Sequence, residues 1–298
     1  MTAISTNGGR IIRRCGRCVH LTSIESNKSN RRHCSRPSKK LQPRRRRPAM
    51  KRQAKLSVAM IARNAEGQIG YVLDSVKWAD EICLADTGSI DNTMEEARKH
   101  GANVISIEFD GFGKARQKAV AMTSHDWVLS LDSDEIVTPE LHKSIEGFLE
   151  HCDEYAGTEF SRVTNLCGHW IRYSGWHPEY VFRLFNKNKA GFDDSPVHES
   201  IKYNGKIKRV SGSLLHYSYP NLEVYSRKAR EYARLGALRK KELSIFTKII
   251  FLVLKPFVSF IRKFIIQRGF MDGLPGLWIA CFTAGGQFLK YYYALRKN

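Results

Sequence analysis

Residues 127–135 have the sequence WVLSLDSDE, which joins an apolar run to a cluster of acids. The run Trp127–Leu131 is almost entirely apolar, as is typical of a strand covered on both faces of a parallel sheet. Asp132 follows at once, and Asp134 comes one residue later. Ligands bind beyond the carboxyl ends of strands in such sheets. The stretch therefore predicts both a buried strand and a candidate site at its end.

Strand-like and helix-like segments alternate on the amino-terminal side of this stretch. The spacing predicts a mostly parallel, doubly wound α/β sheet with helices on both faces. Asp86 ends the second predicted strand, so we expect it at the same edge of the sheet as Asp132. The expected strands are residues 56–61, 81–85, 103–107 and 127–131, and the expected helices are residues 67–79, 93–100 and 115–122.

The carboxyl-terminal half has a different character. Residues 160–220 are rich in aromatic residues, Gly and His, and predict a mixed or antiparallel extension with a strand near 180–186. Residues 223–298 predict amphipathic helices, broken near Pro256 and again at Gly269–Gly276. The chain is accordingly divided into an extension (1–54), an α/β domain (55–222) and a helical tail (223–298).

Charge follows the same division. The net charge of +20 over 298 residues is uneven. Residues 1–54 hold 16 Lys/Arg and one acid, residues 55–222 hold 18 basic and 24 acidic groups, and residues 223–268 hold 12 basic and three acidic groups. A nucleic-acid-binding domain usually carries its basic face on the folded part. Here the α/β part is mildly acidic, so no nucleic-acid partner is expected.

Residues 1–54 are too polar and basic to bury a core, and the composition predicts disorder there. An alternative start of translation at or near Met50 would leave this segment out. The seven Cys residues have no regular spacing, which argues against a disulfide framework and favours a reducing cytoplasm. No apolar core of a secretory signal is visible at the amino terminus.

Asp132 and Asp134 are candidate ligands of a divalent cation. Carboxylate oxygens suit Mg²⁺ or Mn²⁺, and such an ion would neutralise the phosphates of a ligand or leaving group. The alternative is a solvated acidic turn before a helix near Pro139–Phe148. Asp86 has a similar choice, because its carboxylate suits a ribose or base edge but also an Asx-turn that caps the next helix.

A third acidic stretch, GFDDSPVHE, covers residues 191–199. Asp193, Asp194 and Glu199 are candidates for a general base. His198–Glu199 lacks a second His four residues on, so it is no zinc-protease motif. The alternative is a turn formed by the two aspartates.

Three stretches together resemble the family 2 glycosyltransferases, and more narrowly the bacterial lipopolysaccharide core glucosyltransferases of that family. The resemblance covers Leu56 to the carboxyl terminus and leaves out residues 1–54. Two departures are Ala85, where another Asp or Val is more usual, and Ile90-Asp91-Asn92, where Thr-Asp-Gly is. The stretches are IARNAEGQIGYVLDSVKWADEICLADTGSIDNT (61–93), WVLSLDSDE (127–135) and GWHPEYVFRLFNKNKAGFDDSPVHESI (175–201).

The resemblance implies a GT-A fold, metal dependence and inversion at the anomeric carbon. Residues 55–135 would form the nucleotide-sugar half and residues 136–222 the acceptor half. The implied donor is a nucleotide sugar, with UDP-glucose as first candidate, and the implied acceptor is a lipid-linked saccharide, the lipopolysaccharide inner core. The implied roles are uracil contact for Arg63 and Asn64, nucleoside contact for Asp86, metal and diphosphate binding for Asp132 and Asp134, and general base for Glu199, with Asp194 second.

The helical tail combines apolar runs with basic residues. Residues 249–254 and 256–261 are apolar and are flanked by Lys248, Arg262, Lys263 and Arg268. This pattern favours a helix lying on an anionic membrane surface, here the inner face of the inner membrane. Gly273–Leu289 is free of charge over 17 residues, which favours a buried or re-entrant helix over a membrane span. A helical hairpin packed on the core and an oligomer interface are the alternatives.

Two other functions fit parts of the chain. The basic arm alone would suit a nucleic-acid-binding protein. A nucleotidyltransferase that makes the sugar nucleotide would need a glycine-rich phosphate loop after the first strand, but the corresponding Ala62–Gly67 is poor in glycine. Both remain alternatives to sugar transfer.

Overall fold

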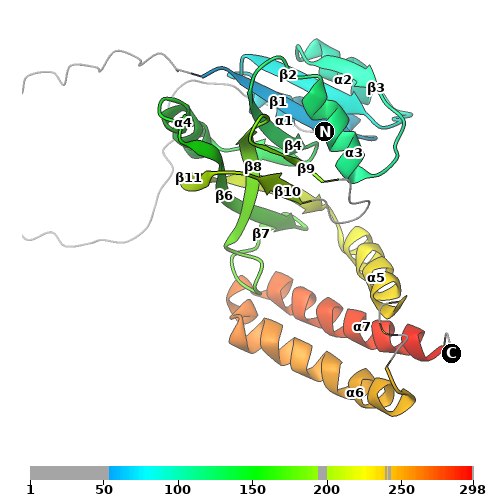
Figure 1. Ribbon diagram of the computed structural model, residues 1–298. Coiled ribbons are helices and arrows are strands. Elements are labelled where there is room, and N and C mark those ends of the chain that lie inside the picture. Colours follow the sequence, from blue (N-terminus) through cyan, green and yellow to red (C-terminus); the bar gives the residue numbers. More distant parts are fainter. Residues whose placement is uncertain (1–53, 194–199, 239, 241–242, 297–298) are drawn as a thin grey trace, which may run out of the picture. The chain divides into compact units, whose positions relative to one another are not determined.

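The computed structural model describes residues 54–193, 200–238, 240 and 243–296. Its amino-terminal half is a parallel sheet whose strands lie in the order β3-β2-β1-β4 (Figure 1). All four strands lie within a residue of the predicted runs, and the doubly wound order confirms the expected topology. They are β1 (Leu56–Ala62), β2 (Glu81–Asp86), β3 (Asn103–Ser106) and β4 (Trp127–Asp132).

Helices cover both faces of this sheet, as predicted. They are α1 (Glu66–Asp74), α2 (Thr93–Lys99), α3 (Phe112–Ala121) and α4 (Pro139–Leu149). Alternate side chains of β1 point to opposite faces. Val58 and Met60 join a core with α1, α2 and α4, whereas Ala59 and Ile61 join a smaller one with α3. The apolar run of β1 is thus explained by burial on both sides.

The sheet continues into an extension of mainly antiparallel pairs, in the order β4-β8-β6-β11-β5. β4 pairs with β8 and β8 with β6 in antiparallel fashion, while β6 and β11 run parallel. This agrees with the predicted mixed extension. Its strands are β5 (Glu135–Val137), β6 (Tyr155–Leu166), β7 (His169–Trp170), β8 (Glu179–Asn186) and β11 (Lys206–Tyr219). A separate two-stranded antiparallel sheet is formed by β9 (Ala190–Phe192) and β10 (Ile201–Tyr203).

The tail is helical, as expected. It consists of α5 (Leu222–Leu238), α6 (Ile245–Ile261), a π-helical turn η1 (Arg262–Ile266), a 3₁₀ turn η2 (Gly269–Asp272) and α7 (Leu274–Arg296). The predicted break near Pro256 is wrong, because Pro256 lies inside α6. A proline removes one helical hydrogen bond, but α6 packs along α7, and such packing supplies most of a helix's stability. The second break occurs at η2, as predicted.

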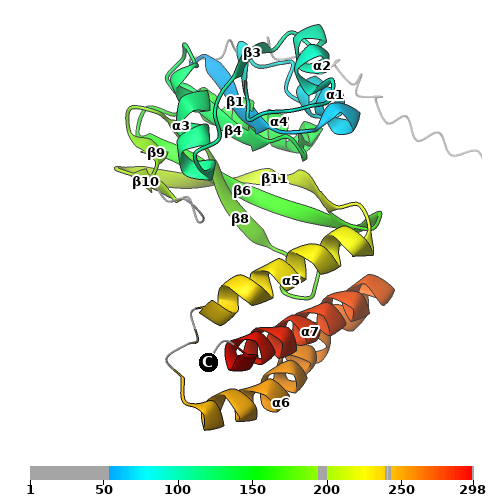
Figure 2. The ribbon, with the colours of Figure 1, turned by 90° about the vertical axis from the view of Figure 1, so that its right-hand side faces the viewer.

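The tail is bonded to the sheet extension. Asp272 of η2 accepts hydrogen bonds from the backbone nitrogens of Arg172 and Tyr173, both at 3.0 Å, and from the Ser174 hydroxyl at 3.2 Å. α7 packs against both α5 and α6 (Figures 1 and 2). Within the described part of the chain, no helix has the length and apolar character needed to cross a membrane.

Candidate active site

The carboxyl ends of β1, β2 and β4 lie side by side at one edge of the sheet. Asp86 is in register with Ala62, and Asp132 is in register with Ile61. The two predicted acids therefore flank the end of β1. A cleft of about 550 Å³ opens beyond this edge, and we call it the strand-end cleft. Its border includes charged side chains of both signs: Arg63, Arg116, Arg162, Lys228, Asp132 and Asp134.

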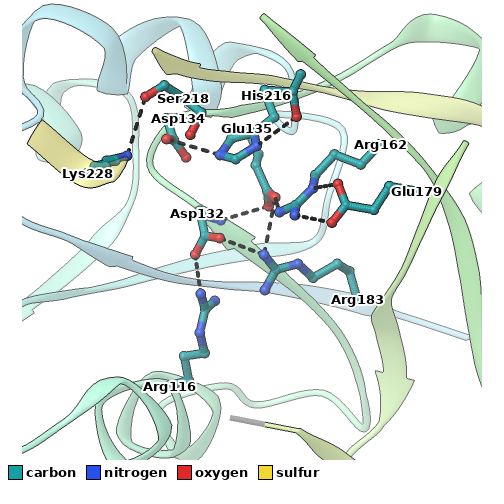
Figure 3. Close-up of polar contacts among 11 residues, drawn as sticks. Arg116, Asp132, Asp134, Glu135, Arg162, Glu179, Arg183, His216, Ser218 and Lys228 are labelled. Atoms are coloured by element: carbon teal, nitrogen blue, oxygen red, sulfur yellow. Dashed lines mark hydrogen bonds and ion pairs between the residues drawn. The ribbon is translucent and has the colours of Figure 1, made fainter. Parts of the chain in front are cut away.

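Asp132 is held between Arg116, which is buried, and Arg183, which is largely buried (Figure 3). Arg116 of α3 donates to Oδ1 at 2.5 Å, and Arg183 of β8 donates to Oδ2 at 2.6 Å. Burial by itself would raise the pKa of Asp132, but the charges of Arg183 and Arg116 outweigh it and hold the pKa well below its usual range. The two arginines therefore favour the ionised form of the carboxylate.

Glu135 contacts Asp132 and two arginines, Arg162 and Arg183. Its side chain is fully buried and accepts hydrogen bonds from Arg162 at 3.0 Å and Arg183 at 3.2 Å. Its other oxygen accepts the backbone N–H of Asp132 at 3.1 Å. Arg162 is held further by Glu179, through bonds of 2.7 and 3.0 Å. Glu135 thus holds Asp132, Arg162 and Arg183 in place. It does not border the strand-end cleft itself.

Asp134 faces a histidine from a distant part of the chain. Nε2 of His216 lies 3.3 Å from Oδ2 of Asp134, and both side chains are partly exposed (Figure 3). The pairing of β5 with β11 places His216 opposite Glu135, and Tyr217 donates its N–H to the Asp134 carbonyl at 2.9 Å. The sequence analysis missed His216. No local motif marks it, because the contact depends on a strand pairing across some eighty residues.

The side chains fit a divalent cation of the Mg²⁺ or Mn²⁺ type. Such ions are commonly bound by one or two protein ligands together with waters and substrate phosphates. Asp134 and His216 offer one carboxylate and one imidazole at the cleft, where phosphates could complete the shell. Among the described residues, no cluster of three or more His, Cys, Asp or Glu could hold a metal. Asp132 as a metal ligand stays a prediction, since an arginine engages each of its oxygens.

Among the predicted nucleoside-contacting residues, Asp86 ends β2, whereas Arg63 and Asn64 follow β1 in a loop that is hydrogen-bonded to the loop after β2. Asp86 is buried and accepts the N–H groups of Gly88 and Ser89 at 3.0 and 2.9 Å, which is the turn-forming alternative for this residue. Asn64 has a positive φ of 51° and accepts the N–H of Ile90 at 2.9 Å. Arg63 borders the strand-end cleft. The roles of Arg63, Asn64 and Asp86 in binding a nucleoside stay predictions.

Both predicted bases, Asp194 and Glu199, lie outside the described residues. Their neighbours on either side are bonded to each other, because Asp193 accepts the N–H of Ser200 at 3.1 Å and its hydroxyl at 2.6 Å. This third acid of the stretch is therefore occupied by a structural contact. The choice between Asp194 and Glu199 stays open.

Comparison with known proteins gives consistent matches. Residues 57–232 match the model of glycosyl transferase family 2. An uncharacterized glycosyltransferase of Rickettsia prowazekii is 30% identical over 259 residues, which cover 79% of this chain and 85% of the relative. The lipopolysaccharide core biosynthesis glycosyltransferase LpsC of Rhizobium meliloti is 26% identical over 262 residues, which cover 82% and 95% of the two chains.

Among solved structures, glucosyl-3-phosphoglycerate synthase of Mycobacterium tuberculosis is similar with a TM-score of 0.33 and 28% identity. That likeness covers 38% of this chain and 45% of the synthase. The family match spans the strand-end cleft and most of the residues that border it. The parallel sheet, its antiparallel extension and the acids at the strand ends form the GT-A-type fold of an enzyme that uses a nucleotide-sugar donor: the chain is a glycosyltransferase and belongs to glycosyl transferase family 2.

Proposed function

We propose that this enzyme transfers a hexose, with glucose as first candidate, from its UDP-sugar to a lipid-linked saccharide such as the lipopolysaccharide inner core. The observation that carries the proposal is the facing pair Asp134 and His216 at the border of a strand-end cleft that also carries basic side chains. A cleft with these charges suits a nucleoside diphosphate bound through a cation. The relationship to LpsC supports the acceptor class.

In this proposal Asp134 and His216 hold the divalent cation, with Asp132 as a further candidate ligand. When bound, the cation neutralises charge on the departing diphosphate. Arg63 and Lys228 border the same cleft and add positive charge where phosphates would lie. Asp132 holds Arg116 and Arg183 in place through its two oxygens, so a donor would meet a rigid site.

Inversion needs one base that removes the proton of the acceptor hydroxyl while the hydroxyl oxygen attacks the anomeric carbon. We assign this role to Glu199, with Asp194 as second candidate. The described residues that flank them support the assignment, since β9 ends at Phe192, which borders a cavity of about 590 Å³ together with Asp132. That cavity and the strand-end cleft share Arg116, Asp132 and Arg162.

The acceptor would reach the enzyme from an anionic membrane surface on the cytoplasmic side. The support is an apolar face along α6, where Phe246 is 71% and Val253 is 73% exposed. Large exposed apolar faces mark interaction sites. Arg262 and Arg268 near its end are exposed as well. Two of the four basic residues expected at the membrane serve the protein instead, since Lys248 is buried and Lys263 donates to the Ser174 carbonyl at 2.8 Å.

The test is transfer from labelled UDP-sugars to membrane extracts, with mass analysis of the product. We expect EDTA to stop transfer and Mn²⁺ or Mg²⁺ to restore it. Asp134→Asn and His216→Ala should each lower kcat/KM by about 100-fold or more and raise the Mn²⁺ concentration needed for half-maximal rate. Asp153→Asn and His151→Ala change exposed residues of the same types and serve as controls.

Transfer that is indifferent both to EDTA and to Asp134→Asn would refute the metal site. Release of pyrophosphate from a nucleoside triphosphate, without sugar transfer, would favour the nucleotidyltransferase alternative. Transfer to a water-soluble acceptor, with none to the lipid fraction, would refute the proposed acceptor class.

A further inference from the structure

Another cavity, of about 390 Å³, lies between α5 and α7, and we call it the α5–α7 groove. It is bordered by Trp176, Tyr225, Phe282, Gly286 and Lys290, among others. Three more bordering residues, Tyr219, Lys228 and Tyr232, also border the strand-end cleft. The groove and the cleft therefore meet, and a ligand that occupies one extends toward the other.

The groove has aromatic walls. Tyr219 and Tyr225 meet edge to face with ring centroids 4.8 Å apart, and Tyr225 meets Phe282 in the same way at 5.0 Å. The ring centroid of Trp176 lies 5.6 Å from that of Tyr219. Such rings offer flat apolar surfaces to the C–H faces of sugars, and few polar groups among them are enough to orient a ligand.

Polar side chains complete the lining. Thr283 and Gln287 of α7 border the groove and suit the hydroxyl groups of a saccharide. An acyl chain in the same place would take the amide of Gln287 out of water without offering it a hydrogen bond, which costs free energy. The composition of the groove therefore favours a saccharide over a lipid tail.

Two lysines add positive charge. Nζ of Lys228 lies 4.9 Å from the ring centroid of Tyr219 and donates to the Ser218 carbonyl at 3.4 Å, at the junction with the strand-end cleft. Lys290 borders the groove from α7, with its stem close to Gly236 of α5. Two ammonium groups along one groove favour a ligand that carries phosphate or carboxylate groups.

We propose that the α5–α7 groove binds the saccharide part of the acceptor, an anionic oligosaccharide, and leads its reacting hydroxyl to the cleft beside Asp134 and His216. The inference rests on the proposed function, since it takes the donor to lie at the ends of β1 and β2. The acceptor would then reach the strand-end cleft through the groove. Tyr219, Lys228 and Tyr232 lie where donor and acceptor meet.

Two neighbouring glycines of α7 provide a matched test. A Cβ added at Gly285 or at Gly286 would meet no heavy atom within 4 Å. Gly286 borders the groove, whereas Gly285 is exposed and does not border it. Gly286→Leu should thus place a side chain in the groove without disturbing the fold, and Gly285→Leu should leave the groove open.

The probe is a de-acylated inner-core oligosaccharide, titrated by calorimetry into the full chain. We expect Gly286→Leu to weaken its binding by about tenfold or more, which corresponds to roughly 1.4 kcal/mol, while UDP-glucose binding stays at the wild-type value. Gly285→Leu should match the wild type for both ligands. Lys290→Gln should weaken binding of the oligosaccharide, and phosphatase treatment of the probe separates phosphate from carboxylate recognition.

Wild-type affinity of Gly286→Leu for the oligosaccharide would overturn the proposal, as would a wild-type protein that fails to bind it. A loss confined to intact, acylated lipopolysaccharide would overturn it too, since the groove would then hold the lipid. If Gly286→Leu loses oligosaccharide binding but the wild type transfers no sugar from any UDP-sugar, the groove stands and the proposed function fails.

Discussion

Asp132, a candidate site residue, should also contribute to stability, because its carboxylate lies between the side chains of Arg116 and Arg183. Asp132→Asn removes the charge and keeps the shape. Breaking a fully buried ion pair costs about 3–5 kcal/mol, and we expect roughly 2 kcal/mol here because the carboxylate is 22% exposed. Denaturant unfolding at pH 7 measures the loss. Asp153→Asn, at an exposed aspartate, should change the free energy of unfolding by less than about 0.5 kcal/mol.

The ion pairs of Asp132 with Arg116 and Arg183 also predict how the free energy of unfolding depends on pH. The pKa of Asp132 is lower in the folded chain than its ordinary value of 3.8. Its contribution to stability is therefore complete well above pH 3.8 and is lost as the pH falls below that value. The stability gap between wild type and Asp132→Asn should stay constant from pH 8 to 5 and narrow below pH 4. A gap that widens on acidification would contradict the arrangement.

For individual residues, the sequence predicted the acids of the candidate site but not the side chains that contact them. Asp132 and Asp134 could be identified because they follow an apolar strand. Arg116, Arg183 and His216 could not, because each comes from a different element and only the sheet order brings them together. For Asp86 the sequence allowed two roles, contact with a nucleoside and formation of the turn that follows β2. The sequence could not distinguish between them.

Among the elements, the turn η2 controls the segment that follows β7. Asp272 accepts three hydrogen bonds from residues 172–174, and the next residues, Gly175 and Trp176, border a cavity of about 360 Å³ beside Arg162 and His216. Asp272→Ala should free this segment and raise the acceptor KM several-fold, since each hydrogen bond to a charged group contributes about 1.5–3 kcal/mol. The KM for the donor should not change.

Hydrogen exchange provides a second measurement for the same variant. Backbone amides of residues 172–174 should exchange faster in Asp272→Ala, with those of β1 and β4 unaffected. Asp110→Ala, which removes an acid from an exposed contact with Lys118, is the matched control. Equal donor and acceptor defects in Asp272→Ala would show a general loss of structure instead.

The elements also show where sequence patterns are sufficient. Apolar runs located β1, β2 and β4, which are largely buried, and also the edge strand β3, which is mostly exposed. The long β6 has no exposed residue and β11 has few buried ones, so neither shows a regular alternation of exposed and buried residues, and the two strands pair across a large separation in sequence. Pro256 suggested a helix end from a local rule, but packing against α7 overrides it.

For the whole molecule, the apolar face of α6 predicts vesicle binding. Val253→Asp combined with Phe257→Asp should reduce binding to vesicles with anionic lipids by about tenfold or more, because burial of each side chain contributes about 1.5–3 kcal/mol. Co-sedimentation measures this. Ile207→Ser, which changes an exposed apolar residue of β11, should bind as the wild type does. If the double variant binds vesicles as the wild type does, the apolar face of α6 does not bind membranes. An oligomer interface would then be the remaining explanation for its exposure.

The strand β11 has a consequence for how the two substrates influence each other. It carries His216 at the candidate metal site, Ser218 and Tyr219 at the junction, and it leads directly into α5, one wall of the groove. A ligand that stiffens β11 from one end lowers the entropic cost of binding at the other. Such coupling is reciprocal. UDP with Mn²⁺ should therefore tighten oligosaccharide binding by the same factor by which the oligosaccharide tightens UDP binding.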